Sequence, residues 1–306
     1  MKKDLVSLAD LTPQELRSYL DDAVTIKKAL KAGNAPAVLA GKTLGMIFQK
    51  PSLRTRVSFE VGMLQLGGHA LYLSPNEIQL GVRESVPDVA RVMARYVDCI
   101  MARVFAHADV LTLAQHSPVP VINGLSDFSH PCQGLADYLT VLEHKGRLAG
   151  LKLAFIGDAN NVYHSLLFGG AKLGVHVACA SPSGYGPAAR VLEIARPFAE
   201  ASGSRVTFTT DPMEAVCDAD VIYTDVWTSM GQEAEAEQRR KAMRPFQVNG
   251  ALVAAAKPDV IVMHCLPAHR GEEITDEIVD GTHSVVFDQA ENRMHAQKAV
   301  LARLMG

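Results

Sequence analysis

The sequence predicts an α/β protein with two domains, each a parallel sheet flanked by helices. Its 306 residues are more than one compact core usually holds and suit two domains of ordinary size. Strand-like and helix-like segments alternate along the whole chain, which is typical of parallel sheets joined by right-handed crossovers. The strand-like segments are continuous apolar runs, as expected for strands that are covered on both faces.

The helices are predicted from their caps and their apolar spacing. The first has Thr12 as its cap and Pro13 at its first helical position, and Ser85 caps a later one. The predicted helices cover residues 12–30, 52–67, 85–97, 132–146, 161–173, 188–201, 232–242 and 288–304. The predicted strands cover residues 43–48, 69–73, 98–104, 119–122, 151–157, 175–180, 205–209, 219–225, 258–264 and 284–288.

The break between the two domains is expected in the polar stretch "EHKGRLAGLK" at 143–152, so we place the boundary between residues 147 and 148. The net charge of -3 argues against a nucleic-acid-binding protein, which usually carries a basic surface. No apolar run approaches the length of roughly 20 residues that a membrane span needs. Acidic residues interrupt the N-terminal segment, which therefore does not resemble a signal peptide. We expect a cytoplasmic protein.

The five cysteines are scattered, with no C-x-x-C pair among them. This favours reduced thiols over a disulfide framework or a zinc site. Only Cys132 and Cys265 have neighbours with reactive side chains.

Polar clusters follow the predicted strands at the point where each strand ends. In open parallel sheets, ligands bind at these carboxyl ends, so the clusters predict a cleft between the two domains. The clusters are "QKPSLRTR", Arg103, "NGLSDFSHPCQ", "GDANN", "DVWTSMG" and "HCLPAHRG".

The stretch "QKPSLRTR" predicts an anion site at a helix N-terminus. If the helix begins near Leu53, its free N–H groups and the side chains of Ser52, Arg54 and Thr55 together can hold an anion. Arg56 either joins this site or pairs with Glu60 one turn later. We expect the apolar positions of this helix to form one buried stripe, made of Leu53, Val57, Val61 and Leu64.

Three other clusters offer groups for binding or proton transfer. His130 and Gln133, in "HPCQ", can donate hydrogen bonds to a carbonyl group, whereas a metal site there is poorly supported. Asp225 ends one strand and suits a cationic amine, and Cys265 ends the next strand. A nucleophilic role for Cys265 is disfavoured, because the side chain of its neighbour His264 points to the opposite face of an extended strand.

The turn "GDANN" resembles a dinucleotide-binding turn but lacks the required glycines, since Ala159 and Val162 occupy those positions. Asn160 and Asn161 instead offer amides that suit a carboxylate. A nicotinamide dehydrogenase is therefore disfavoured, and a non-catalytic phosphate or amino-acid sensor stays as an alternative.

Over its whole length the chain resembles the aspartate/ornithine carbamoyltransferase family, and its ornithine-specific members in particular. The motifs that carry the resemblance are "SLRTR", "HPCQ", "DVWTSMG", "HCLP" and the late "ENR" at 291–293, in the family's order. The resemblance implies a carbamoyl-phosphate domain over 1–147 and an ornithine domain over 148–287. It also implies that the C-terminal helix, 288–306, crosses back to the first domain.

The same resemblance implies the site residues. Those for carbamoyl phosphate are Ser52, Leu53, Arg54, Thr55, Gln79, Arg103, His130, Gln133, Cys265, Leu266 and Arg293, with Gln79 reaching the neighbouring subunit's site. Those for ornithine are Asn161, Asp225, Ser229 and Met230. The residues expected to act in catalysis are Arg54, Arg103, His130, Asp225 and Cys265.

The implied reaction transfers the carbamoyl group of carbamoyl phosphate to the δ-amine of L-ornithine, giving L-citrulline and phosphate in arginine metabolism. No metal or organic cofactor is expected, and the expected assembly is a homotrimer or a multiple of trimers. The chain departs from the family at Leu53, where the usual residue is threonine. We expect weaker but surviving phosphate binding there, because the backbone N–H and the arginines remain.

Overall fold

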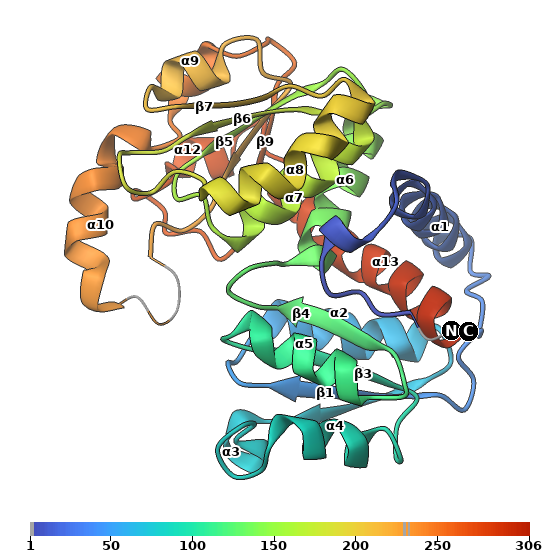
Figure 1. Ribbon diagram of the computed structural model, residues 1–306. Coiled ribbons are helices and arrows are strands. Elements are labelled where there is room, and N and C mark those ends of the chain that lie inside the picture. The colour runs from blue at the N-terminus through green and yellow to red at the C-terminus, as the bar shows by residue number, and fades with distance from the viewer. Residues whose placement is uncertain (1–2, 229–230, 232) are drawn as a thin grey trace. The chain divides into compact units, whose positions relative to one another are not determined.

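The structure, a computed structural model, describes residues 3–228, 231 and 233–306. The chain forms two compact units, one made of Met1–Leu139 with Glu291–Gly306 and the other of Thr140–Ala290. Each unit is a parallel sheet flanked by helices (Figure 1). The C-terminal helix packs on N-terminal elements of the first unit, so the predicted fold class is confirmed.

The first unit contains a four-stranded sheet in the order β2-β1-β3-β4. All its neighbouring strands run parallel, with Phe48 at the end of β1 paired with Arg103 at the end of β3. The strands are β1 (Thr43–Phe48), β2 (His69–Leu73), β3 (Cys99–Arg103) and β4 (Val121–Leu125).

Helices cover both faces of this sheet (Figure 1). Because right-handed crossovers lead from β1 outward to β2 and then back to β3 and β4, α2 lies on one face and α4 and α5 lie on the other. The face of α4 and α5 is sealed by an apolar cluster that includes Ile47, Val89, Ile100 and Leu113. The elements are η1 (Leu8–Asp10), α1 (Pro13–Lys31), α2 (Leu53–Gln65), α3 (Pro75–Ile78), α4 (Val86–Met93), α5 (His107–His116) and the first part of α6 (Pro131–Lys145).

Helix α2 buries a different face from the one predicted. Leu53 and Leu64 are 74% and 70% exposed, so the expected stripe of Leu53, Val57, Val61 and Leu64 is wrong. One reason is the approach of the C-terminal helix α13 (Val286–Met305), whose Lys298 and Leu301 lie against the space beside Gly62. The buried residues of α2 are Thr55, Ser58, Phe59, Gly62 and Met63.

The second unit contains a five-stranded parallel sheet in the order β7-β6-β5-β8-β9. Its register aligns Ile156 with Thr224 and Thr224 with His264, so three strands end side by side. The strands are β5 (Lys152–Ile156), β6 (His176–Ala180), β7 (Val206–Thr209), β8 (Val221–Thr224) and β9 (Ile261–His264).

Helices α7 and α8 follow β5 and β6 and pack against each other on one face of this sheet (Figure 1). An apolar cluster on the sheet also joins α9, α11 and α12, through residues such as Val216, Leu252 and Ile278. The elements are α7 (Asn161–Leu173), α8 (Ala189–Ser202), α9 (Pro212–Val216), η2 (Glu233–Glu235), α10 (Ala236–Met243), η3 (Arg244–Phe246), α11 (Gly250–Ala254) and α12 (Asp276–Val279).

One predicted strand is absent from the described residues. Residues 284–288 were expected to be a strand, but Ser284 makes only an isolated bridge to Val262, and α13 begins at Val286. Val285 and Val286 are buried where the helix starts, whereas Phe287 is exposed. A short apolar run does not by itself distinguish a strand from a helix segment. In the part of the chain that the structure describes, none of the helices combines the length and the apolar character needed to cross a bilayer.

Candidate active site

The first unit gathers polar groups at the carboxyl ends of β1 and β3. Because Phe48 and Arg103 are paired, the segment leaving β1 and the side chain ending β3 meet at the same edge of the sheet. Ser52 then caps α2, with its Oγ accepting from the backbone N–H of Thr55 at 3.3 Å. The anion site predicted from the sequence therefore has the local geometry of a capped helix N-terminus.

Thr55 is the centre of this cluster. Its fully buried Oγ1 lies 3.1 Å from Ser52 Oγ, 3.3 Å from Arg103 Nη1 and 3.4 Å from Arg293 Nη2. Arg103 and Arg293 are 7% and 4% exposed, so two guanidinium groups are held in a poorly solvated place at the start of a helix. Such an arrangement attracts an anion strongly, because both the charges and the helix dipole favour it.

The two arginines of α2 differ in their surroundings. Arg54 is half-buried in the first turn of the helix, which contains no acidic residue to offset its charge. Arg56 is exposed, pairs with Glu60 at 2.9 Å and lies 4.0 Å from the centroid of the Tyr72 ring. Of the two alternatives left open for Arg56, the structure therefore contains the pairing with Glu60.

His130 and Gln133 stand at the start of α6, in the same unit. Burial and the nearby charges of Arg293, Arg103 and Lys50 hold the pKa of His130 well below its usual value, so its imidazole is neutral at neutral pH. Gln133 accepts from Arg293 Nη1 at 2.7 Å and donates to Asp137 at 2.7 Å. A neutral imidazole and a fixed amide are groups that can bind a carbonyl without adding charge.

Lys50 is a further cation beside this cluster, with Nζ 4.9 Å from the centroid of the Phe105 ring. Burial, and secondly the charge of Arg103, lower its pKa to about 8. Below that pH Lys50 is protonated and adds to the attraction for an anion, and above it the charge is lost.

We therefore expect the affinity of this cluster for an anion to fall as the pH passes through about 8. Calorimetric titration with sulfate, whose charge is constant over this range, at pH about 7 and about 9 measures the change, with Lys50→Arg as the comparison. Arginine keeps its charge between these pH values, so the affinity of the variant should stay flat. An equal fall in both proteins would show that another group is responsible.

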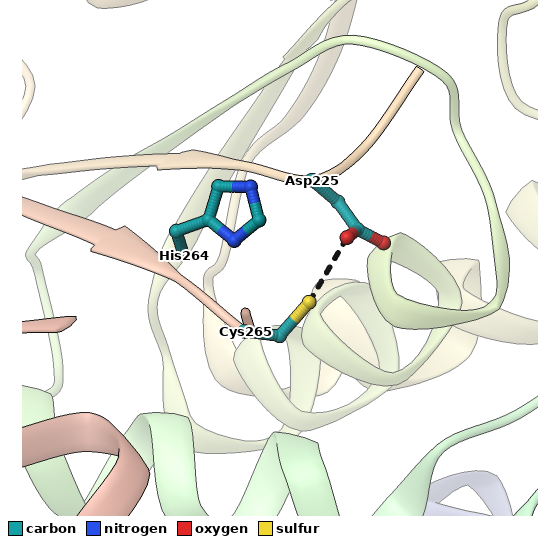
Figure 2. Close-up of side chains that lie close together, drawn as sticks. All are labelled: Asp225, His264 and Cys265. Atoms are coloured by element: carbon teal, nitrogen blue, oxygen red, sulfur yellow. Dashed lines mark hydrogen bonds between the residues drawn. The ribbon is translucent and has the colours of Figure 1, made fainter. Parts of the chain in front are cut away.

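The second unit gathers its polar groups at the ends of β5, β8 and β9. Asn160, Asp225 and Cys265 follow these three adjacent strands, and both Asn160 and Cys265 contact Asp225. Asn160 Nδ2 donates to Asp225 Oδ2 at 2.7 Å. The Cys265 thiol donates to Asp225 Oδ1 at 3.0 Å, as Figure 2 shows. Asp225 is 7% exposed, so its carboxylate is a buried negative group suited to a cationic amine.

His264 lies near this pair but its ring is engaged elsewhere. Nδ1 accepts the backbone N–H of Leu266 at 2.8 Å, which fixes the proton on Nε2, and Nε2 donates to the buried Glu273 at 3.0 Å. The potential ligand atoms of Asp225, His264 and Cys265 lie within 4.8 Å of one another (Figure 2). Since both ring nitrogens already have partners, His264 supports the shape of the 264–273 loop rather than acting as a base for Cys265.

The remaining predicted residues vary in their setting. Leu53 and Gln79 are exposed, and Gln79 ends α3 in the left-handed conformation. Asn161 is the first residue of α7, and Leu266 follows Cys265. Ser229 and Met230 lie outside the described residues.

Cys132, the other cysteine with reactive neighbours, is buried, and burial raises the pKa of its thiol to about 12. It therefore stays protonated and acts as a packing residue.

Two residues near the site, Gln49 and Arg239, make supporting contacts that were not predicted from the sequence. Gln49 accepts the N–H of Phe105 at 2.7 Å and donates to Asp109 at 2.9 Å, which fixes the loop between β1 and α2. Arg239 pairs with Asp158 at 2.7 Å and donates to the carbonyl of Trp227 at 3.3 Å. These partners are distant along the chain, so the sequence does not predict the contacts. Arg239 also pairs with Glu235 one turn before it, at 3.0 Å.

Comparison with known proteins agrees with this geometry. Residues 3–143 match the carbamoyl-P binding domain of aspartate/ornithine carbamoyltransferase, and residues 149–304 match its Asp/Orn binding domain. An ornithine carbamoyltransferase of Thermococcus kodakarensis is 60% identical over 99% of this chain and 96% of its own. An anabolic ornithine carbamoyltransferase of Pyrococcus furiosus is 59% identical over the same shares.

The solved structure of an ornithine carbamoyltransferase from Pyrococcus furiosus has a TM-score of 0.97 to this chain, at 59% identity, and covers 99% of this chain and 97% of that one. The chain belongs to the aspartate/ornithine carbamoyltransferase family.

Proposed function

We propose that this chain is an enzyme that transfers the carbamoyl group of carbamoyl phosphate to the δ-amine of L-ornithine, giving L-citrulline and phosphate. The observation that carries the proposal is the convergence of Ser52, Arg103 and Arg293 on Thr55 at the N-terminus of α2. This cluster fits a small, highly charged phosphate group. Relatives of about the same length at 59–60% identity, named as ornithine carbamoyltransferases, support the acceptor.

Carbamoyl phosphate binds in the first unit. Ser52, Arg54, Thr55 and the first-turn N–H groups, including that of Leu53, hold the phosphate, and Arg103 and Arg293 neutralise its charge. His130 and Gln133 bind the carbamoyl group, with the neutral imidazole donating to the carbonyl oxygen as negative charge develops on it. A preorganised donor of this kind is worth about 100- to 1000-fold in rate.

Ornithine binds in the second unit. Asn161 takes the carboxylate, and Asp225, with Ser229 and Met230, binds the α-amino end. The backbone carbonyls of Cys265 and Leu266 accept from the carbamoyl nitrogen. The δ-amine must lose its proton before it attacks, since a free amine of this type has a pKa near 10.4, and either the Asp225–Cys265 pair or the phosphate accepts that proton.

In this proposal residues 1–147 with 288–306 form the carbamoyl-phosphate domain and 148–287 the ornithine domain. Each reaction step uses side chains and backbone groups, with no metal or organic cofactor. The anabolic direction, towards arginine biosynthesis, is proposed from the anabolic enzyme among the relatives. The five cysteines are unpaired with one another, which suits a reducing cytoplasm.

Incubation of the purified protein with carbamoyl phosphate and L-ornithine tests the function, with colorimetric measurement of citrulline. We expect rapid citrulline formation and none when either substrate is omitted. Product with acetylornithine or aspartate instead of ornithine would change the acceptor. Binding of carbamoyl phosphate without product from any amine would leave only a sensor.

We further propose that the chain assembles as a homotrimer, in which Gln79 reaches a neighbouring subunit's site. The support is an apolar face on the first unit that the chain itself leaves uncovered. Val57 on α2 and Leu71 on the edge strand β2 are 46% and 50% exposed, beside the exposed Leu53 and Leu64. Exposed apolar groups next to an unpaired strand edge are typical of subunit interfaces.

Light scattering with size exclusion is expected to give a mass of about three times the 33.0 kDa of one chain. Val57→Lys with Leu71→Lys is expected to shift this peak to the monomer, because two charges would be buried at the interface. Val92→Lys with Leu111→Lys is the matched control, since these residues of α4 and α5 are 46% and 51% exposed. If the trimer persists in the Val57/Leu71 double variant but dissociates in the Val92/Leu111 double variant, the interface lies on the α4–α5 face instead.

A further inference from the structure

Asn160 joins the N-terminus of α7 to the carboxylate of Asp225. Its Oδ1 accepts the backbone N–H groups of Val162 at 2.9 Å and Tyr163 at 3.3 Å, which makes it the cap of the helix. Its Nδ2 donates to Asp225 Oδ2 at 2.7 Å. One side chain therefore fixes a helix start and a buried carboxylate at the same time.

The orientation of this amide follows from its partners. The helix offers only N–H donors, so the amide oxygen must face α7 and the amide nitrogen must face Asp225. A flip of the amide would break both the cap and the bond to the carboxylate. The donor that faces Asp225 is thus set by the backbone of α7.

Every partner described around Asp225 donates to it. Asn160 holds Oδ2, while the Cys265 thiol and the N–H of Val226 hold Oδ1 at 3.0 and 2.8 Å. Both carboxyl oxygens of Asp225 are thus held as hydrogen-bond acceptors, the arrangement that also suits an ammonium group. Asn160 therefore fixes the rotation of the Asp225 carboxyl group and keeps Oδ2 as a hydrogen-bond acceptor.

We propose that Asn160 is a positioning residue for recognition of the amino-acid substrate. Its cap fixes the start of α7, where Asn161 is assigned to the carboxylate, and its amide fixes Asp225, which is assigned to the α-ammonium group. The side chain of Asn160 thereby sets the distance between Asn161 and Asp225, the two groups that recognise the substrate. This inference rests on the function proposed above, and Asn160 itself need not touch the substrate.

Asn160→Asp separates the two roles of the residue. Aspartate is as good a cap as asparagine, so α7 should keep its start, but the donor to Asp225 is replaced by a second negative oxygen. We expect the KM for ornithine to rise about 10- to 100-fold, with the KM for carbamoyl phosphate changed less than about threefold. Asn160→Ser, which keeps a cap oxygen and removes the donor without adding charge, should show the same selective rise.

The matched control is Asn249→Asp. Asn249 caps α11 in the same unit, accepting the N–H of Leu252 at 3.2 Å, so this variant changes a cap in the same way at a distance from the site. We expect both its KM values to match the wild type. Ornithine kinetics of Asn160→Asp and Asn160→Ser that match those of the control would overturn the proposal, as would equal rises in both KM values.

Binding of L-norvaline to the protein saturated with carbamoyl phosphate gives a readout without turnover. L-norvaline keeps the α-amino and α-carboxyl groups of ornithine and lacks the δ-amine, so calorimetry reports on the recognition end alone. We expect Asn160→Asp to weaken this binding by the same factor as the rise in KM. Unchanged norvaline binding would contradict the positioning role, whereas a wild-type protein that makes no citrulline would contradict the proposed function instead.

Discussion

Arg54→Ala is expected to lower the kcat for citrulline formation by at least about 100-fold while leaving the folded protein at least as stable as the wild type. The two effects have one cause. Arg54 lies in the first turn of α2 without an acidic residue in that turn, so its charge opposes the helix dipole until an anion binds. Removing it should raise the free energy of unfolding of the empty protein by about 0.3–1 kcal/mol.

Arg56→Ala is the matched control for this prediction. It removes a guanidinium two positions further along the same helix, where the partner is Glu60 and not the Thr55 cluster. We expect turnover within about threefold of the wild type and a loss of less than about 1 kcal/mol in the free energy of unfolding. Chemical denaturation and citrulline kinetics on the three proteins measure both quantities. Normal turnover of Arg54→Ala, or an equal loss in Arg56→Ala, would show that the anion site is assigned to the wrong residues.

The strand ends were predictable from the sequence because they depend on local pattern. Continuous apolar runs mark buried parallel strands, and the polar residue that follows each run must lie at the carboxyl edge of its sheet. This predicted that Arg103, the segment after β1, Asp225 and Cys265 all lie at the carboxyl ends of strands, although it did not give the order of the strands. The register of β1 with β3 and of β8 with β9 bears out that reasoning.

The face of α2 was not predictable in the same way. Leu53, Val57 and Leu64 have the spacing of a buried stripe, yet the chain buries the stripe through Thr55 and Phe59. A periodicity argument assumes that apolar residues face their own core. It fails where an apolar face is reserved for another copy of the chain, as we propose here.

The contacts made over long sequence separations do not follow from local pattern either. Arg293 reaches Thr55 and Gln133 from the last helix. The sequence placed these three residues in one site only through the family resemblance, which gave no contacts between them. The roles of the two asparagines in "GDANN" depend on which one becomes the helix cap. Asn160 takes that place, and its amide is then committed to Asp225.

Asp225→Asn is expected to lower kcat/KM for ornithine by at least about 100-fold, with little change in the KM for carbamoyl phosphate. The substitution removes the buried charge that pairs with the α-ammonium group and keeps the shape of the side chain. In either orientation the new amide also sets its nitrogen against a donor, Asn160 Nδ2 or the N–H of Val226, so one of the hydrogen bonds of 2.7 and 2.8 Å is lost. We therefore expect the free energy of unfolding to fall by about 1–3 kcal/mol as well.

The exchange variant, Asp225→Asn with Asn160→Asp, distinguishes these two losses. The amide now at position 225 donates to the carboxylate now at position 160, which still accepts the N–H groups of Val162 and Tyr163. The hydrogen bond is restored with donor and acceptor exchanged. The free energy of unfolding should therefore recover most of what Asp225→Asn lost. Activity should not recover, because the negative charge has moved from the end of β8 to the start of α7 and no longer faces Cys265. Denaturation curves and ornithine kinetics on both variants test this, and recovery of activity in the exchange variant would mean that the position of the charge does not matter.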